Sequence, residues 1–548
     1  MLRAVADPRP VPAELRAAWR ALGLTSDESL SLLLERTAGR WGASVAVVDL
    51  VGGRSLTWHE LESEVRAFTA WLRARGVAHG DVVLAQAPNA LGLLVAWWAA
   101  WQAGCVFVPV VDIYRAHELR RVVELVRPDV VVTVAEHRGH RPPEMFEELL
   151  AEADVKARVV VDGEAAGWTS WADARADGAG AAGAPDALAP DEPALVLFTS
   201  GTTSAPKGVV HTSRTLTAEA RQFATNYGLD WRDVLFLPVP LAHVTGLIVG
   251  LLVPGTTGCR LVLSRMAGLE RAAEEAVEHE ATFTVGPVAE IEHLDAVHRA
   301  RGIAIPKLVA FATGGAQFPE RELRIGEALG IGPARSYGMT ECPSVTTPSG
   351  ADSAHLRLRT DGRMPAGVEC QAVDPETRAP LPLGAEGELR VRGPERMVGY
   401  LDPDETLAAL DREGWFSTGD LGVVDGDGAI TITGRIKDII NRGGEKFSAR
   451  DIENVLLAHA AVAEIAVIAA PDERYGEVPA AFLVAAAGAE RPAAPVLADW
   501  LATRGVAAQK TPVHWHWLDA LPSTPSGKVK KFELRRVLDA ARAEGGAT

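Results

Sequence analysis

The residues best suited to chemistry lie in one stretch, residues 197–211, which reads LFTSGTTSAPKGVVH. An apolar run leads there into a loop of hydroxyl-bearing residues and glycine that ends at Lys207. Exposed backbone N–H groups, hydroxyl groups and one ammonium group together suit the negative charge of a triphosphate. We therefore predict a phosphate-binding loop, with hydroxyl groups from Thr199, Ser200, Thr202 and Thr203.

The loop differs from the Walker phosphate loop, which has glycine before its lysine and serine or threonine after it. Pro206 and Gly208 occupy those two places here. A solvated Ser/Thr turn is the simpler alternative, but such a turn rarely combines so many donors with a lysine. Phosphate binding is therefore the better interpretation.

Short apolar runs alternate with amphipathic segments of helix length between about residues 55 and 340, which predicts parallel sheets flanked by helices. The predicted strands are residues 130–134, 195–199, 260–263, 282–285 and 308–311. The predicted helices include residues 269–280 and 319–329. The loop that ends at Lys207 directly follows one of these strands.

The sequence pattern changes after this region. Residues 178–193, rich in Ala, Gly, Pro and Asp, are predicted to be a poorly ordered linker between two α/β halves. After Ser344, short strands such as residues 387–392 and 429–432 predict a small β unit. A compact α+β piece is predicted beyond residue 435, with one helix and two strands at residues 449–458, 464–468 and 480–484.

Length and composition exclude several classes of protein. A chain of 548 residues with 47% hydrophobic and 23% charged positions can bury the cores of several domains, so it is neither disordered nor fibrous. Its 55 basic and 72 acidic residues give a formal net charge of −17, which would repel a nucleic-acid backbone over most of the surface. Nucleic acid is therefore not expected as a partner.

The sequence is typical of a cytoplasmic protein. Its N-terminus has no signal-peptide pattern, and the uncharged run at residues 82–111 is interrupted by Pro88, Asn89 and Pro109. Those interruptions favour a buried helix followed by a buried strand over a membrane span. The cysteines form no CxxC pair, which argues against a disulfide framework or zinc site and fits a reducing compartment: Cys105, Cys259, Cys342 and Cys370.

Four further motifs follow the loop in order: SYGMTECP (336–343), STGDLG (417–422), GRIKDIINRGGEKFS (434–448) and PSTPSGKVKKFELR (522–535). With the loop, they span most of the chain and resemble the motifs of the acyl- and aryl-CoA synthetases. That superfamily of AMP-forming ligases also contains firefly luciferase and the peptide-synthetase adenylation domains. Five motifs in register make chance a poor explanation of the resemblance.

The resemblance implies an α/β fold with two hinged domains. Residues 1–435 would form a large AMP-binding N-terminal domain, made of two α/β subdomains (about 1–190 and 191–343) and a small β unit (344–435). Residues 436–548 would form a small, mobile α+β C-terminal domain, hinged at Lys437, that carries the catalytic lysine Lys528.

The resemblance also implies three cofactors, namely ATP/AMP, Mg²⁺ and coenzyme A. Tyr337 should stack on adenine, Thr340 should bond the α-phosphate, and Glu341 should hold Mg²⁺, which carboxylates commonly bridge to phosphates. Asp420 should accept both ribose hydroxyls, and Arg435 should contact the ribose. The remaining positions implied to bind the nucleotide are Thr199, Ser200, Gly201, Thr202, Thr203, Ser204, Lys207, Gly314, Gly315, Ala316, Ser336, Gly338, Met339 and Ile432.

The implied reaction has two halves. A substrate carboxylate attacks the α-phosphorus of ATP and forms an acyl-adenylate with loss of pyrophosphate, and a coenzyme A thiol then attacks the acyl carbon and releases AMP. A positive charge at Lys528 would offset the charge that gathers on the carboxylate and α-phosphate oxygens. Gly443 and Gly444 should approach the pantetheine arm, and Lys446 could meet the phosphates of coenzyme A.

Several of these positions also have purely structural interpretations. Tyr337 could be a core tyrosine, and Asp420 could be a turn or helix-cap aspartate. Gly314 and Gly315 could form an ordinary turn, and Lys528 could be a solvated lysine of a basic tail.

The acid should bind in a mostly apolar pocket lined by residues 240–250 together with Phe311, Met339 and Pro343. His243 is expected to gate this pocket or position the carboxylate, with helix capping as the alternative. Amino-acid-activating relatives place an aspartate in this region, whereas residues 238–254 contain no acidic residue. We therefore expect a carboxylic acid other than an amino acid. The segment also resembles that of ligases for cyclic or aryl acids more than that of ligases for long-chain fatty acids.

Two alternative functions stay open. Ser204 stands where the family's loop usually has a glycine, and serine adopts positive φ less readily. An enzyme that mainly forms the thioester from a ready-made acyl-adenylate is one alternative, and a stand-alone adenylation enzyme that loads a carrier protein is the other. The expected partners are a small carboxylic acid and coenzyme A, and a homodimer is left open.

Overall fold

The structure is a computed structural model, and it describes residues 9–180, 185–199, 206–264, 268–286, 289–301, 310–314, 320–330, 332–348, 352–523 and 529–545. These residues divide into two compact units. Unit 1 comprises the described residues up to 369 together with residues 391–416, and unit 2 comprises residues 370–390 and the described residues from 417 onward. The predicted domain boundary near residue 436 stays a prediction.

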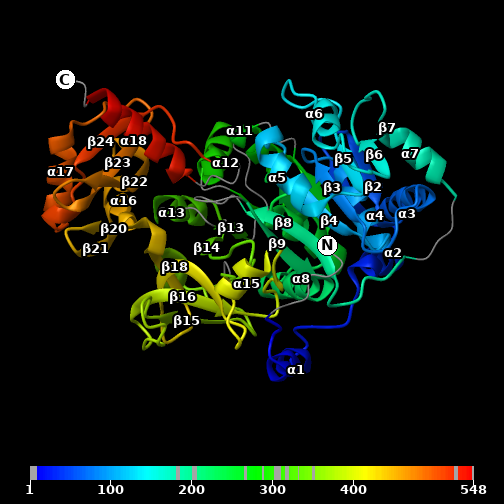
Figure 1. The fold of residues 1–548 in the computed structure, drawn as a ribbon, viewed down its shortest axis with the longest axis horizontal. Helices are drawn as coiled ribbons and strands as arrows, with labels where there is room; N and C mark the ends of the chain where they lie inside the picture. Colours follow the sequence, from blue (N-terminus) through cyan, green and yellow to red (C-terminus); the bar gives the residue numbers. More distant parts are fainter. Residues whose placement is uncertain are drawn as a thin grey trace. The chain divides into compact units, whose positions relative to one another are not determined.

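Unit 1 contains an eight-stranded sheet (Figure 1). Strands β3 to β8 pair in parallel, whereas β9 runs antiparallel to both of its neighbours, β8 and β17. In order across the sheet the strands are β17 (Gly399–Tyr400), β9 (Lys207–Thr212), β8 (Pro193–Thr199), β4 (Val106–Val110), β3 (Val82–Gln86), β5 (Val130–Thr133), β6 (Ala157–Val160) and β7 (Thr169–Ser170).

Helices cover both faces of this sheet, which explains why its strands are continuous apolar runs. Val83 and Phe107 pack with α3, α4 and α7 on one face, and Leu84 and Val108 pack with α5 and α6 on the other. Successive strand residues alternate between the two clusters, as the two-residue period of a strand requires. These helices are α3 (Trp58–Ala74), α4 (Leu91–Gln102), α5 (Ala116–Val126), α6 (Pro142–Leu149) and α7 (Trp171–Gly178).

A second sheet of seven strands completes the core of unit 1. Its strand order is β14 (Pro333–Ser336), β13 (Ala310–Gly314), β12 (Phe283–Val285), β10 (Val234–Leu237), β11 (Arg260–Leu263), β1 (Val45–Asp49) and β2 (Arg54–Thr57). Neither sheet is built from one continuous part of the sequence. β1 and β2 join the seven-stranded sheet, whose other strands begin at residue 234, whereas β8 and β9 join the eight-stranded sheet with β3 to β7. Sheet membership therefore crosses residue 190 in both directions.

The helices of the second sheet separate into two groups. α11 and α12 cover Phe236 and Val262, whereas α8 and α10 pack on Leu235 and Leu261 in one cluster with α3 and α4 of the first sheet. The largest apolar core of unit 1 thus lies between its two sheets. The remaining helices of unit 1 are α1 (Ala13–Ala21), α2 (Leu33–Trp41), α8 (Ser213–Tyr227), α9 (Val244–Leu247), α10 (Val253–Thr257), α11 (Leu269–Glu278), α12 (Ala289–Arg301), α13 (Glu320–Ala328), α14 (Ala354–Arg359) and α15 (Pro403–Ala409).

Helix α4 accounts for the long uncharged run in the sequence. All its residues are buried, and Trp97 stacks on Phe107 of β4 with ring centroids 4.4 Å apart. The predicted buried helix followed by a buried strand is thus confirmed. Among the helices that the structure describes, none has both the length and the apolar character needed to cross a bilayer.

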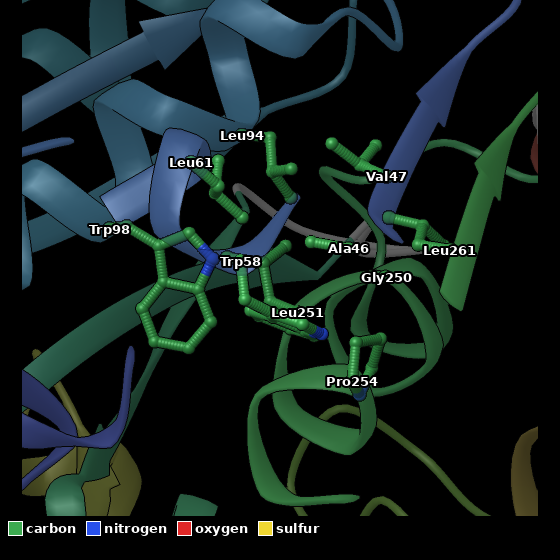
Figure 2. A pocket seen from close by; sticks show the side chains of 10 residues that line it. All are labelled: Ala46, Val47, Trp58, Leu61, Leu94, Trp98, Gly250, Leu251, Pro254 and Leu261. Atoms are coloured by element: carbon green, nitrogen blue, oxygen red, sulfur yellow. The ribbon is translucent and has the colours of Figure 1, made fainter. Parts of the chain in front are cut away.

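A small cavity marks the packing between the sheets (Figure 2). It has a volume of about 10 Å³ and is lined entirely by apolar side chains and backbone, including Trp58, Trp98, Leu251 and Pro254. A cavity of this size and character holds no ligand and stays dry. It is a packing gap and not a candidate site.

Unit 2 is built on two sheets. A four-stranded sheet, with order β15 (Glu369–Val373), β16 (Glu386–Arg392), β18 (Phe416–Val424) and β19 (Ile430–Arg435), lies almost wholly within it. In a second, five-stranded sheet, the order is β21 (Glu445–Ser448), β20 (Ile439–Arg442), β23 (Gly476–Ala485) and β22 (Val462–Asp472), with β24 (His514–Leu518) also paired to β23. α16 (Ala449–Leu457) and α17 (Ala494–Thr503) cover one face of this sheet, and α18 (Lys531–Gly545) covers the other.

The predicted elements agree with the structure to within a few residues where both can be compared. The strands predicted at residues 130–134, 260–263 and 282–285 are β5, β11 and β12, and the helix predicted at residues 449–458 is α16. β22 and β23 are longer than predicted at both ends. Residues 308, 309 and 319 of the predicted strand and helix, and residues 181–184 of the predicted linker, lie outside the described residues.

Two buried carboxyl groups stand out in unit 1. Glu219 of α8 has no exposed surface, and its Oε1 atom accepts a hydrogen bond of 2.5 Å from the Ser344 hydroxyl. Burial raises the pKa of Glu219 to about 7. Burial and the neighbouring Glu219 raise the pKa of Glu395 to about 8. Both groups therefore bind a proton more tightly in the folded chain than in the unfolded one.

Gly246 provides a test of the packing around α9. A Cβ atom at this position would lie 1.9 Å from the Pro240 carbonyl oxygen, which is backbone and cannot move aside. We expect Gly246→Ala to destabilise the protein by about 2–3 kcal/mol. Gly39→Ala is the control, because Gly39 is an exposed residue of α2 with open space around its Cα atom, and it should stabilise by about 0.5–1 kcal/mol. Equal melting temperatures for the two variants would contradict this.

Glu219→Gln tests the buried carboxyl group through the pH dependence of stability. The folded-state pKa of about 7 lies above the ordinary value of 4.5, so the wild type loses stability from Glu219 as the pH rises through this window. The glutamine variant lacks that loss, and its melting temperature relative to the wild type should rise between pH 5 and pH 8. The gain is at most about 3 kcal/mol.

The control for Glu219→Gln is Glu270→Gln, at an exposed position in α11. That change should leave the pH dependence of the melting temperature unaltered. Parallel pH profiles for wild type and Glu219→Gln would show that Glu219 ionises as readily in the folded chain as in the unfolded one.

Candidate functional site

The predicted phosphate-binding loop connects two paired strands of unit 1. β8 and β9 are antiparallel, and their register places Thr199 directly opposite Lys207. The two ends of the loop are therefore held side by side. The predicted residues between them, Ser200, Gly201, Thr202, Thr203 and Ser204, lie outside the described residues.

The other edge of β9 carries the short strand β17. Tyr400 pairs with Val209, and the Leu401 N–H donates to the Gly208 carbonyl at 2.8 Å. Residues directly opposite each other in an antiparallel pair share a face, and alternate residues of one strand do so too. The side chains of Lys207, Val209 and Tyr400 therefore lie on the same face of the sheet.

A tight turn presents the two residues predicted to act on the α-phosphate and the metal. Met339 and Cys342 exchange backbone hydrogen bonds of 3.0 and 3.1 Å, which leaves Thr340 and Glu341 at the tip. Gly338 permits this turn, because a Cβ atom there would lie 2.0 Å from the Pro343 carbonyl oxygen.

Three hydrogen bonds attach this turn to β9, which carries Lys207, and to the segment of residues 397–400 that includes β17. The Thr340 carbonyl accepts from His211 Nε2 at 2.8 Å, and the Glu341 carbonyl accepts from the Met397 N–H at 2.8 Å. The Glu341 carboxylate accepts from the Tyr400 hydroxyl at 2.8 Å. The fold of unit 1 thus brings together Lys207, Thr340 and Glu341, which are far apart in sequence.

His211 supports the turn as a neutral imidazole. It is fully buried, and burial lowers its pKa to about 4. A carbonyl oxygen can only accept, so Nε2 carries the hydrogen, and Nδ1 faces the Thr215 hydroxyl at 3.2 Å. His211 holds the Thr340 backbone without introducing a charge.

The other predicted residues of unit 1 lie on the strands that precede this turn. Gly314 of β13 pairs with Ser336 of β14, and Tyr337 follows directly, with 8% of its surface exposed. Its backbone N–H donates to the Thr346 hydroxyl at 2.7 Å. Gly315 and Ala316 lie outside the described residues.

The predicted acid-binding segment forms a continuous helical run. α9 is followed by a π-helical turn, Ile248–Leu252, and then by α10, and the residues of the π-turn are all buried. His243 is the N-cap of α9, and its Nδ1 atom accepts from the Thr245 N–H at 3.3 Å. The capping interpretation of His243 is therefore confirmed, and its role toward a substrate stays a prediction. The side chain of Phe311 lies outside the described part of the chain.

Unit 2 contains the residues predicted to bind ribose. Asp420 of β18 lies opposite Arg435 of β19, and Arg435 Nε is 2.8 Å from Asp420 Oδ1. The Asp420 N–H donates to the Thr418 hydroxyl at 3.0 Å, and only 4% of Asp420 is exposed. Ile432 of β19 pairs with Gly422, and Lys437 lies in a short 3₁₀ turn directly after this strand.

The glycine pair of unit 2 makes a two-residue hairpin turn between β20 and β21. Gly443 and Gly444 have φ values of 63° and 95°, which other residues adopt only with strain. Lys446 lies 3.2 Å from Glu376 at an exposed position, so this ion pair is weak. Lys528 lies outside the described residues, and the residues on either side of its loop, Ser523 and Val529, form a β-bridge.

The residues around Glu341 fit a magnesium ion that is held mainly by phosphates. Across the described ranges, no three His, Cys, Asp or Glu side chains gather in a way that could enclose a metal. Mg²⁺ needs no such cage, because it commonly binds one or two carboxylates together with water and substrate phosphates. Glu341, partly exposed at the tip of its turn, offers such a carboxylate.

Several residues of this site were not singled out from the sequence. Tyr400, His211, Glu219 and Ser344 all act across the fold, through partners at least 59 positions away. The sequence around Tyr400, MVGYL, reads only as an apolar run with a glycine. His211 ends the stretch of residues 197–211 that was predicted to bind phosphate, and no local pattern marked the other three residues.

Comparison with known proteins identifies the family of the chain. Residues 34–401 match the family of AMP-binding enzymes, and residues 451–528 match the AMP-binding enzyme C-terminal domain. The chain is 33% identical over 524 residues to a medium-chain fatty-acid–CoA ligase of Escherichia coli, with 95% of this chain and 92% of that protein covered.

Two further relatives cover nearly the whole chain. The salicyl-AMP ligase / salicyl-S-ArCP synthetase of Mycobacterium tuberculosis is 33% identical over 545 residues, with 97% of this chain and 94% of that protein covered. The crystal structure of ATP-bound MatB from Rhodopseudomonas palustris superposes with a TM-score of 0.83 at 27% identity, covering 93% of this chain and 99% of that one. The predicted α/β fold, with a large AMP-binding domain and a small C-terminal domain, is thereby confirmed. The chain belongs to the family of AMP-binding enzymes, and within it to the AMP-forming acid–CoA ligases.

Proposed function

We propose that the protein joins a cyclic, aryl or other non-amino carboxylic acid to coenzyme A through an acyl-adenylate, converting ATP to AMP and pyrophosphate. The observation that supports this most directly is the convergence of Lys207, Thr340 and Glu341 on one side of β9. An ammonium, a hydroxyl and a carboxylate so arranged suit a metal-bound polyphosphate.

In the first half-reaction, an oxygen of the acid attacks the α-phosphorus of ATP and the bond to the β-phosphate oxygen breaks. Lys207 and the donors of its loop balance the charge of the departing pyrophosphate. The Thr340 hydroxyl would donate a hydrogen bond to the α-phosphate, and Glu341 would hold Mg²⁺, which neutralises phosphate charge when bound. His211 contributes indirectly, since it fixes the Thr340 backbone.

In the second half-reaction, the thiol of coenzyme A attacks the acyl carbon, and AMP leaves. We assign Asp420 and Arg435 to the ribose, because an acceptor-only side chain suits two hydroxyl donors. Gly443 and Gly444 are assigned to the pantetheine arm, Lys446 to the phosphates of coenzyme A, and Lys437 to the hinge. Lys528 is assigned to the charge that develops on the reacting carboxylate and α-phosphate.

The choice of acid rests on the composition of residues 238–254. This stretch contains no acidic residue that could pair with a substrate ammonium, and its helical run is apolar and buried. Two of the relatives at 33% identity are named for a medium-chain fatty acid and for salicylate, so identity alone favours neither of these. We infer an acid with an uncharged, compact body.

A carrier protein is the second candidate acceptor. The relative named as a salicyl-S-ArCP synthetase matches the chain as closely in identity as the relative named as a CoA ligase does. A third candidate, thioester formation from a ready-made acyl-adenylate, depends on Ser204 weakening the phosphate loop. The carrier-loading candidate shares the first half-reaction with the proposed ligase, and the third candidate shares the second half-reaction.

One experiment separates these candidates. Pyrophosphate release from ATP is measured with benzoic, salicylic, cyclohexanecarboxylic and octanoic acids and with phenylalanine, and the product mass is determined with coenzyme A or with a holo carrier protein. We expect release with at least one cyclic or aryl acid, none with phenylalanine, and an acyl-CoA product. An acyl product found only on the carrier protein favours the second candidate, an enzyme that loads a carrier protein. If no acid causes pyrophosphate release and synthetic acyl-adenylates are converted to thioesters, the third candidate is favoured.

Lys528→Ala tests the assigned catalytic lysine. Loss of its charge should lower the rate of acyl-adenylate formation by about 100-fold or more, because preorganised charge at the reacting oxygens is lost. Lys510→Ala is the matched control, since Lys510 pairs with Asp451 on the surface of unit 2, and it should keep the wild-type rate. An unchanged rate in Lys528→Ala at saturating ATP and acid would remove Lys528 from the mechanism.

A further inference from the structure

Tyr400 contacts two groups of opposite charge in the candidate site. Its hydroxyl donates to Glu341 Oε1 at 2.8 Å, and the Lys207 Nζ atom lies 4.9 Å from the centre of its ring. The first contact is a hydrogen bond to a carboxylate, and the second is within the range of a cation–π interaction. One side chain therefore touches both the proposed metal ligand and the lysine of the phosphate loop.

The surroundings of Tyr400 hold its backbone in a single position. Its N–H donates to the Thr406 hydroxyl at 2.8 Å, and Thr406, at the centre of α15, is fully buried. Gly399 allows this close approach, because a Cβ atom there would lie 2.8 Å from Thr406 Cγ2. With pairing to Val209 of β9 as well, Tyr400 is fixed relative to Lys207.

The phenol of Tyr400 acts only as a donor toward Glu341. A carboxylate oxygen accepts hydrogen bonds, and the Tyr400 hydroxyl lies 2.8 Å from Glu341 Oε1 as the donor. Only 5% of Tyr400 is exposed, and water therefore competes little for the hydrogen bond.

Lys207 forms its ion pair with Glu405 and not with Glu341. The Lys207 Nζ atom lies 3.4 Å from Glu405 Oε1, and both side chains are 34% exposed. Exposed pairs of this kind are weak, so an arriving phosphate can take the place of Glu405. Lys207 contacts the ring of Tyr400, and the Glu341 carboxylate accepts its hydrogen bond from the hydroxyl of the same tyrosine.

We propose that Tyr400 is a positioning residue for Mg·ATP, which orients the Glu341 carboxylate toward the metal and keeps Lys207 available for the phosphates. This inference rests on the proposed function, since it takes the nucleotide roles of Glu341 and Lys207 from it. Without Tyr400, the ammonium and the carboxylate could pair directly and neutralise each other. The site would then bind both metal and polyphosphate less well.

Tyr400→Phe tests the hydroxyl while keeping the ring beside Lys207. The binding of Mn²⁺ in the presence of α,β-methylene-ATP, which cannot be cleaved at the reacting bond, is followed by electron paramagnetic resonance of the free ion. We expect the Mn²⁺ dissociation constant to rise about 10-fold. The dissociation constant of AMP without metal should stay within about 2-fold, because AMP lacks the phosphates that the metal bridges.

A double-mutant cycle separates positioning from packing. Because Tyr400 is inferred to act through Glu341, Tyr400→Phe should add little to the loss of Mn²⁺ affinity already caused by Glu341→Gln. Tyr114→Phe, at a partly buried tyrosine of unit 1, is the control and should match the wild type. The KM for ATP at limiting Mg²⁺ should rise in Tyr400→Phe and return toward the wild-type value at high Mg²⁺.

The outcomes of this experiment are distinguishable. A wild-type protein that binds Mn²⁺ with the ATP analogue, and a Tyr400→Phe variant that binds it equally well or more tightly, would falsify the inference alone. Additive effects of Tyr400→Phe and Glu341→Gln would also overturn it, since the phenol would then act independently of Glu341. A wild-type protein that binds neither the analogue nor Mn²⁺ would overturn the proposed function and this inference together.

Discussion

The hydrogen bonding of β9 on both of its edges is the constraint on which the candidate site of unit 1 depends. Pairing with β8 places the two ends of the phosphate loop opposite each other, and pairing with β17 brings Tyr400 beside the same strand. The strand period of two then sets Lys207 and His211 on one face. That face meets the turn of Thr340 and Glu341. A shift of one residue in either register would move these side chains to the opposite face.

The groups proposed to bind ligands differ in exposure from the groups that hold them in place. Lys207 and Glu341, the groups proposed to act on ligands, are partly exposed. Tyr400 and His211, which contact Glu341 and the Thr340 backbone, are buried. His211 is neutral because burial lowers its pKa to about 4. It therefore holds the turn without adding a charge beside the ligand-binding groups.

Local sequence was sufficient for the elements and for the positions of the motifs. The apolar runs of β5, β11 and β12 and the uncharged helix α4 are recognisable because burial on both sides removes polar residues from them. The motif residues Lys207, Thr340 and Glu341 were identified from composition and resemblance, and the fold brings them together.

Long-range pairing could not be predicted from the sequence in the same way. β1 and β2 join a sheet whose other strands begin at residue 234, and no local pattern encodes that choice. Tyr400 belongs to the site because a two-residue strand pairs with β9, almost 200 positions earlier in the chain. For His243, the sequence suggested both substrate contact and helix capping, and the structure establishes the cap.

The segment proposed to receive the acid has little room to change its backbone. Cβ atoms at Gly246 and Gly250 would lie 1.9 Å from the Pro240 carbonyl oxygen and 2.5 Å from Leu241 Cδ2, so the helical run is packed directly on the turn that precedes it. The π-helical turn between α9 and α10 adds a residue to the helical register there, and such turns often occur at functional sites. A backbone held this closely gives the proposed pocket a shape that depends on its side chains. Differences in acid preference among related enzymes should therefore arise from exchanges of apolar side chains along this run and not from movement of its glycines.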